Sequence, residues 1–95
     1  METIIDPKFS PGQVVATRGA YEALMRLEQD PTPFLIRHLS GDWGDIPPED
    51  VAENERSLQH GYRLMSVYYL FDRTKIWVIT EADRSSTTIL LPEEY

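Results

Sequence analysis

The spacing of the apolar residues changes at Gly61, and this change constrains the fold more than any other feature of the chain. Before Gly61, apolar residues recur at helical spacing in short segments bounded by proline and glycine. After Gly61, the segment 63–71 is rich in Tyr, Val and Leu, and a second apolar run occupies 75–80. Asp72-Arg73-Thr74 separates these two runs and predicts the turn of a β-hairpin. Helices followed by strands in this order indicate an α+β fold.

The helical part of the chain carries recognisable start and stop signals. Thr17 is a good N-cap, because its hydroxyl can accept a hydrogen bond from an amide of the first turn. Prolines suit the first positions of the later helices, and Gly61 suits the end of the last one. We predict helices over 18–29, 33–39 and 48–60. The short run Val14-Val15-Ala16 is either an edge strand or the entry to the first helix.

We expect one domain over residues 1–95, because a chain of 95 residues can bury a single core. A turn at 83–86 and a strand over 87–91 extend the hairpin into a meander. The expected parts are an irregular lead-in, a mainly helical part and an antiparallel β meander, over 1–12, 13–61 and 62–92. The predicted architecture is therefore two or three N-terminal helices packed on a three- to four-stranded antiparallel sheet.

The cysteine and histidine content bounds the chemistry. The chain has no cysteine and only two histidines, and their spacing matches no zinc motif, so we expect no metal site and no cofactor. It has no apolar run of the length that spans a bilayer, and Glu2 and Asp6 stand where a secretion signal would be basic. We expect a cytoplasmic protein that makes no membrane contact.

The net charge bears on the choice of partner. The chain carries a formal charge of −7 and has a pI near 4.6. A nucleic-acid-binding protein needs a cationic surface that displaces counterions from phosphate, so we do not expect direct nucleic-acid binding. An acidic protein instead favours a protein partner with a basic surface. The alternative is that the charge serves solubility alone.

The segment from Asp42 to Glu55 holds six acidic residues and no basic one. Its first part is a glycine-flanked loop that also contains Trp43, an aromatic residue favoured at binding hot spots. As partner-binding candidates we take Asp42, Trp43, Asp45, Glu49, Asp50 and Glu53. Under the alternative interpretation, the acids form a solvated face and Trp43 is a lid over the core. The spacing does not match a calcium-binding loop.

A second set of polar residues suggests catalysis. His38 stands at the end of a predicted helix, and histidine titrates near neutral pH, which suits a general acid or base. Glu81 and Arg84 stand at a strand end beside hydroxyl residues, where they suit a base and a phosphate clamp. The alternatives are a helix-end histidine and an arginine–carboxylate pair with Ser/Thr turn bonds. His60 is interpreted as structural.

The stretch from Phe34 to Tyr95 resembles a small bacterial protein family labelled plasmid-related. The resemblance covers about two-thirds of the chain and depends on three motifs: His38…Gly41-Asp42-Trp43-Gly44-Asp45, the run 79–88, and Leu91-Pro92. It implies a mobile-element setting and no particular activity. The order of helices and meander, with His, Glu, Arg and Thr in the later part, is also similar at the fold level to the barnase, colicin and RelE-like ribonucleases.

Two functional hypotheses follow. In the first, the chain is a non-enzymatic accessory protein of mobile elements that binds and modulates a host protein complex, in counter-defence or regulation. In the alternative, it is a small ribonuclease-like enzyme or toxin. His38 and Glu81 would then share the acid and base roles, and Arg84 would stabilise charge on phosphate. A homodimer formed by an exposed strand edge is a third possibility.

Overall fold

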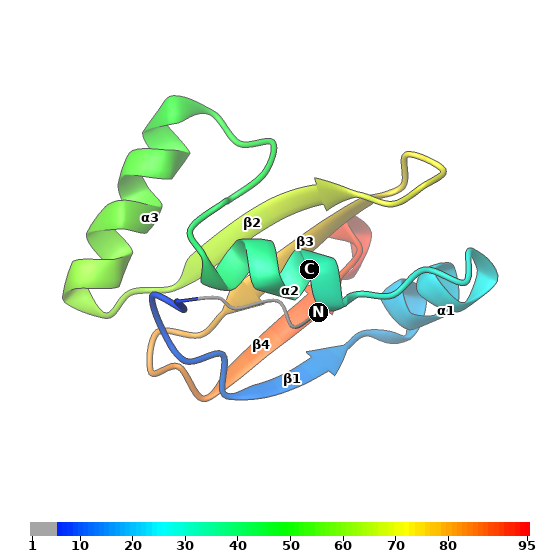
Figure 1. Cartoon of the computed structure of the whole chain (residues 1–95), viewed down its shortest axis with the longest axis horizontal. Helices are drawn as coiled ribbons and strands as arrows, with labels where there is room; N and C mark the ends of the chain where they lie inside the picture. The colour runs from blue at the N-terminus through cyan, green and yellow to red at the C-terminus, as the bar shows by residue number, and fades with distance from the viewer. Residues whose placement is uncertain (1–5) are drawn as a thin grey trace.

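Four strands form one mixed sheet in the order β1-β4-β3-β2 (Figure 1). The computed structural model describes residues 6–95. The strands are β1 (Gln13–Ala16), β2 (Leu64–Tyr69), β3 (Lys75–Thr80) and β4 (Ser86–Leu90). The last three form the predicted antiparallel meander, with Trp77 paired to both Val67 and Leu90. The α+β class is therefore confirmed.

The prediction of a purely antiparallel sheet was wrong, because β1 pairs with β4 in parallel. Gln13 donates its N–H to the carbonyl of Ser85, and Thr17 donates to the carbonyl of Ile89. β1 and β4 therefore run in the same direction, toward the end of the sheet at which the first helix begins. Of the two interpretations of Val14-Val15-Ala16, the edge strand is the one found in the structure. No local signal in the sequence indicates that this strand pairs with β4.

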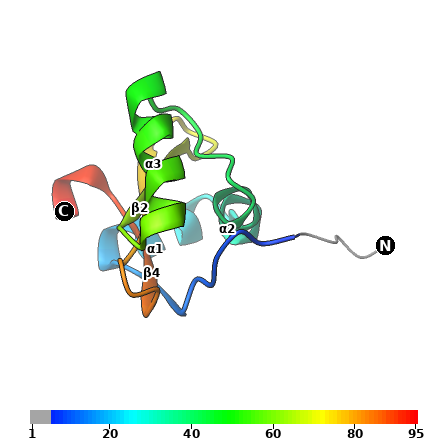
Figure 2. The same ribbon diagram turned by 90° about the vertical axis from the view of Figure 1, so that its left-hand side faces the viewer.

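Three helices precede the meander, and each takes a different position. They are α1 (Arg18–Arg26), α2 (Thr32–Leu39) and α3 (Pro48–His60). Only α2 lies across a face of the sheet, whereas α1 lies at one end and α3 beside the outer edge of β2 (Figure 1). Figure 2 views the sheet edge-on, with α2 on one side and the C-terminal 3-10 helix η1 (Pro92–Glu94) on the other. The structure thus differs from the expected packing of two or three helices on the sheet, because α1 lies at its end and α3 beside its edge.

The helix ends show how local signals define the elements. The Thr17 side chain accepts from the Ala20 N–H as the predicted N-cap, and Gly61 ends α3 with a left-handed φ of 74°. The first helix stops at Arg26, short of the predicted residue 29, because Glu28 adopts a left-handed φ of 51°. None of the helices in the described part of the chain combines the length and the apolar character that crossing a bilayer requires.

The hydrophobic core lies between α1, α2 and one face of the sheet. Phe34 of α2 stacks on Tyr68 of β2, with 5.4 Å between the ring centroids. The other members of this core come from α1, from the same face of the strands and from the residue after β2: Ala20, Ala23, Leu24, Ile76, Val78, Ile89 and Leu70. The core therefore fixes α1 and α2, while α3 contributes only Asn54 and Ser57 to the buried residues.

Gly44 brings the loop before α3 onto the outer edge of β2. It forms a parallel bridge with Val67, and its φ is 77°. A Cβ at this position would lie 1.9 Å from the Val67 carbonyl oxygen, so no other residue fits. Val67 also donates to the carbonyl of Trp43 and accepts from the N–H of Asp45. The acidic loop is thus an ordered extension of the sheet.

Candidate functional site

The acidic face of the molecule is the exposed surface of α3. The helix begins at Pro48, and Glu49 and Asp50 lie in its first turn, where acids are favoured by the helix dipole. Glu49, Asp50 and Glu53 are all exposed. The buried residues of the helix are Asn54 and Ser57, and most of its surface faces solvent, as its polar sequence predicts.

Asn54 fixes α3 against the sheet. Its Nδ2 donates to the Met65 carbonyl at 2.8 Å, and its Oδ1 accepts from the Met65 N–H at 3.2 Å. The side-chain amide therefore pairs with β2 as another strand would. Because Asn54 is 5 % exposed, both bonds are shielded from water and hold the helix at a defined distance from the strand.

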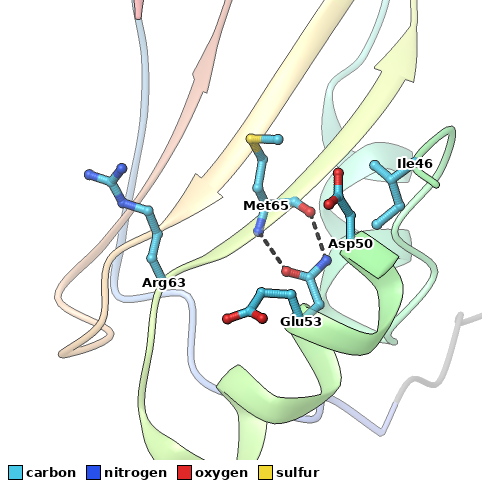
Figure 3. A pocket seen from close by; sticks show the side chains of 6 residues that line it. Ile46, Asp50, Glu53, Arg63 and Met65 are labelled. Carbon is cyan, nitrogen blue, oxygen red and sulfur yellow. Dashed lines mark hydrogen bonds between the residues drawn. The ribbon is translucent and has the colours of Figure 1, made fainter. Parts of the chain in front are cut away.

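A hollow of about 200 Å³ lies between α3 and β2 (Figure 3). Met65 and Ile46 supply its apolar surface, and Asp50 and Glu53 line it from the helix side. The two acids are three residues apart, which places them on the same face of a helix. Among the described residues, Asp50 forms no ion pair, whereas Glu53 pairs with Arg56. The hollow thus combines an apolar surface with two carboxylates.

Arg63 lines the opposite side of the hollow. Its guanidinium donates to the Tyr95 hydroxyl at 2.6 Å and to Glu81 at 3.4 Å. The hydrogen bond to Tyr95 and the charge of Glu81 raise the pKa of Arg63 further. Its charge is therefore directed toward Glu81, away from the two acids of α3.

The loop candidates have structural partners. Asp42 accepts from Arg37 at 2.8 Å and 3.3 Å, and this bonding lowers its pKa. Trp43 is 4 % exposed and donates its indole N–H to Glu55 at 3.1 Å, which is the position of a lid over the core. Asp45 accepts from the Tyr69 hydroxyl at 2.7 Å. Of the six predicted partner-binding residues, these three hold the loop, and the three on α3 face solvent.

His38 lies inside the protein with no exposed surface. Its Nδ1 is 2.6 Å from the Ser66 hydroxyl, and its Nε2 is 2.9 Å from the Thr80 hydroxyl. Thr80 continues this buried chain to Thr87, which donates to the Pro11 carbonyl. The ring is also packed between aromatic residues, with the centroids of Phe9 at 5.2 Å and Trp43 at 5.7 Å.

The environment of His38 keeps its imidazole neutral. Burial and, as a smaller contribution, the positive charge of Arg84 together lower the pKa of His38 to about 4. Both ring nitrogens are occupied by hydroxyls, and the ring does not reach solvent. A substrate therefore has no path to this residue.

Arg84 and Glu81 also have partners. The Arg84 guanidinium donates to backbone carbonyls at the end of α3 and in the turn before β4: Ser57 at 3.0 Å, Tyr62 at 2.6 Å, Glu81 at 3.1 Å and Ala82 at 3.2 Å. The Glu81 carboxylate faces Arg63. The expected pair between Arg84 and a carboxylate is replaced by these carbonyl contacts. The structure thus places the three catalytic candidates in one region of the molecule but gives each a different structural partner.

Sequence reasoning missed the members of the site that are not acidic. Ile46, Asn54, Arg63 and Met65 line the hollow together with the two acids. Asn54 follows Asp50 by one helical turn, and this spacing was the one sequence signal that could have placed Asn54 on the same face of the helix. Met65 belongs to β2 and Arg63 immediately precedes that strand, and only the tertiary fold brings them to α3.

Within residues 6–95, no group of three His, Asp or Glu side chains comes close enough to hold a metal ion. In comparisons with known proteins, no family model, no curated protein and no solved structure matches the chain.

Proposed function

We propose that this protein is a non-enzymatic interaction protein that docks the acidic face of α3 on a basic surface of a host protein complex and modulates it. One observation carries the proposal. Asp50 and Glu53 stand beside a hollow whose apolar surface comes from Met65 and Ile46. A mobile-element setting is part of the proposal and comes from the sequence resemblance alone.

The hollow suits one long basic side chain of the partner. The methylene stem of a lysine or arginine packs on apolar surface while its charged end stays at the rim. Met65 and Ile46 would contact that stem, and the carboxylates of Asp50 and Glu53 would bind the charged end. The volume of about 200 Å³ is below the roughly 300–1,000 Å³ of most small-molecule pockets, which favours a side chain over a metabolite.

The catalytic alternative draws no support from the geometry. An acid–base residue must reach a substrate, and His38 has no exposed surface. A phosphate clamp needs free donors, and Arg84 already donates to four carbonyls. We therefore place the function on the surface of α3.

A charge-reversal experiment tests the proposal. Tagged protein is used to capture partners from a nuclease-treated bacterial lysate, and the dissociation constant of each stoichiometric partner is measured by calorimetry. Asp50→Lys with Glu53→Lys should weaken binding at least about tenfold, because like charges then face each other across the interface. Asp50→Asn with Glu53→Gln should weaken it less.

The matched control is Asp6→Lys with Glu93→Lys. This variant changes the net charge by the same amount at two exposed acids outside α3. Unchanged affinity in this control, together with loss in the α3 variant, supports a local docking site. Equal losses in both variants would mean that only net charge matters, and full affinity in the α3 variant would exclude the site.

A further inference from the structure

The outer edge of β1 is open to solvent. All four residues of the strand are exposed, including Val14 at 43 % and Val15 at 40 %. Gln13 and Thr17 donate their N–H groups inward to β4. Because these groups alternate in direction along a strand, the N–H and C=O of Val14 and Ala16 point away from the sheet. This edge therefore offers hydrogen-bonding groups to another strand.

The opposite edge of the sheet is closed. Asn54 pairs with the backbone of Met65, and the loop at Trp43 and Asp45 pairs with the backbone of Val67. These contacts use the outward backbone groups of Met65 and Val67, which are the first two of the three outward-facing residues of β2. Within residues 6–95, β1 is thus the edge of the sheet at which a strand from another chain can add.

An apolar groove lies next to this open edge. It has a volume of about 230 Å³ and runs between β1, α1 and the segment that leads into α2. Tyr21 and Met25 of α1 line it and are 56 % and 60 % exposed. Among the described residues, none that lines the groove is charged. An exposed strand edge beside an apolar groove is typical of an interaction surface.

We propose that β1 pairs antiparallel with β1 of a second copy, about a two-fold axis through Val15. In this register Val14 of each copy lies opposite Ala16 of the other, so the outward groups of both strands are satisfied at once. Tyr21 and Met25 then lie beside the joined strands, where the second copy covers them.

Charge favours a second copy at this surface. The chain has a net charge of −7, so two copies repel each other over most of their surfaces. The segment from Gly12 to Leu27, which holds β1 and α1, contains two arginines and one glutamate. Two copies can therefore approach here without bringing their acidic faces together. The dimer joins two four-stranded sheets and leaves the α3 hollows at its far ends.

The absence of cysteine allows a direct test of the register. In the proposed dimer the two Val15 residues form a non-hydrogen-bonded pair, with about 4.5 Å between their Cα atoms. This distance lies within the roughly 4.4–6.8 Å that a disulfide spans. Val15→Cys should therefore form a covalent dimer under mild oxidation. The two Val14 residues are only diagonal neighbours, at roughly 7–8 Å, so Val14→Cys should form much less covalent dimer.

Phe71→Cys is the control for random collisions, because Phe71 is 75 % exposed on the β2–β3 hairpin, away from β1. Rapid cross-linking of Val15→Cys alone supports the proposal. Cross-linking of Val14→Cys in preference to Val15→Cys, or equal rates in all three variants, would overturn it.

Sedimentation of the unmodified protein gives a second readout. We expect a concentration-dependent monomer–dimer equilibrium. Val14→Pro removes an outward N–H while leaving the inward bonds of Gln13 and Thr17 in place, so it should yield a folded monomer. Circular dichroism checks its fold. A wild-type protein that stays monomeric at every concentration, or a dimer that Val14→Pro leaves intact, would overturn the proposal.

Discussion

At the scale of single residues, His38 links the stability of the core to pH. Its pKa in the folded protein is about 4, against an ordinary value of 6.5, because burial disfavours the charged ring and Arg84 adds to the effect. A histidine with a lowered folded pKa binds a proton on unfolding, so acid favours the unfolded state. The free energy of unfolding should therefore fall as the pH drops from about 6.5 toward 4, by about 3 kcal/mol in total.

The pH effect of His38 can be isolated by comparing two glutamine variants. His38→Gln keeps groups that can bond to Ser66 and Thr80 but cannot titrate, so its stability should depend less on pH between about 4.5 and 7. His60→Gln changes the exposed histidine and should follow the wild-type curve. Urea denaturation at several pH values measures both. Parallel curves for His38→Gln and the wild type would contradict the assignment.

Arg84 is a structural tie between the end of α3 and the turn before β4. A lysine keeps the charge, but its compact ammonium has three donors and cannot span the four carbonyls that the planar guanidinium reaches. Arg84→Lys should therefore lower the free energy of unfolding by roughly 2 kcal/mol, whereas Arg18→Lys, at a residue whose side chain is 90 % exposed, should change it little. Thermal and urea denaturation measure the difference. Equal stability of the two variants would show that the carbonyl contacts contribute nothing.

At the scale of elements, Asn54 anchors the middle of α3 to β2. Asn54→Leu removes both bonds to Met65 and leaves its backbone groups without these partners, so we expect a loss of about 2–3 kcal/mol. Gln59→Ala, at an exposed position of the same helix, is the control. Hydrogen exchange at the Met65 amide should accelerate in Asn54→Leu more than at the Ile76 amide in the middle of the sheet. Unchanged protection of Met65 would exclude this anchoring role.

Elements whose signals are local could be predicted from the sequence, and those that depend on distant partners could not. Thr17 and Gly61 define helix ends through their own backbone and neighbours, so α1 and α3 were predicted close to their true bounds. The partner of β1 lies about seventy residues away along the chain, and no local pattern encodes it.

The same division applies to the candidate site. Asp50 and Glu53 were visible in the sequence as part of an acidic run, because charge on a polar helix is a local property. The apolar surface beside them was not, since Met65 belongs to β2 and only the tertiary fold brings it to α3. His38 shows the reverse case: the residue type suggested catalysis, and its burial between α2 and the sheet is set by tertiary packing.

At the scale of the whole molecule, charge and hydrogen-bonding groups occupy opposite edges of the sheet. The exposed acids of α3 lie beyond β2, and the open, uncharged edge is β1. The two proposed interactions therefore differ in their physical basis. Docking of α3 depends on attraction between unlike charges, and pairing of β1 depends on backbone hydrogen bonds and apolar contact.

Salt should act on these two interactions in opposite directions. Added salt screens the attraction between α3 and a basic partner, so that dissociation constant should rise. It also screens the mutual repulsion of two chains that each carry −7, so the monomer–dimer dissociation constant should fall. Calorimetry with the captured partner and sedimentation of the protein alone, across the same salt series, measure the two constants. A dimer that weakens with salt would mean that charge pairs hold it together, and the β1 edge would then be the wrong surface.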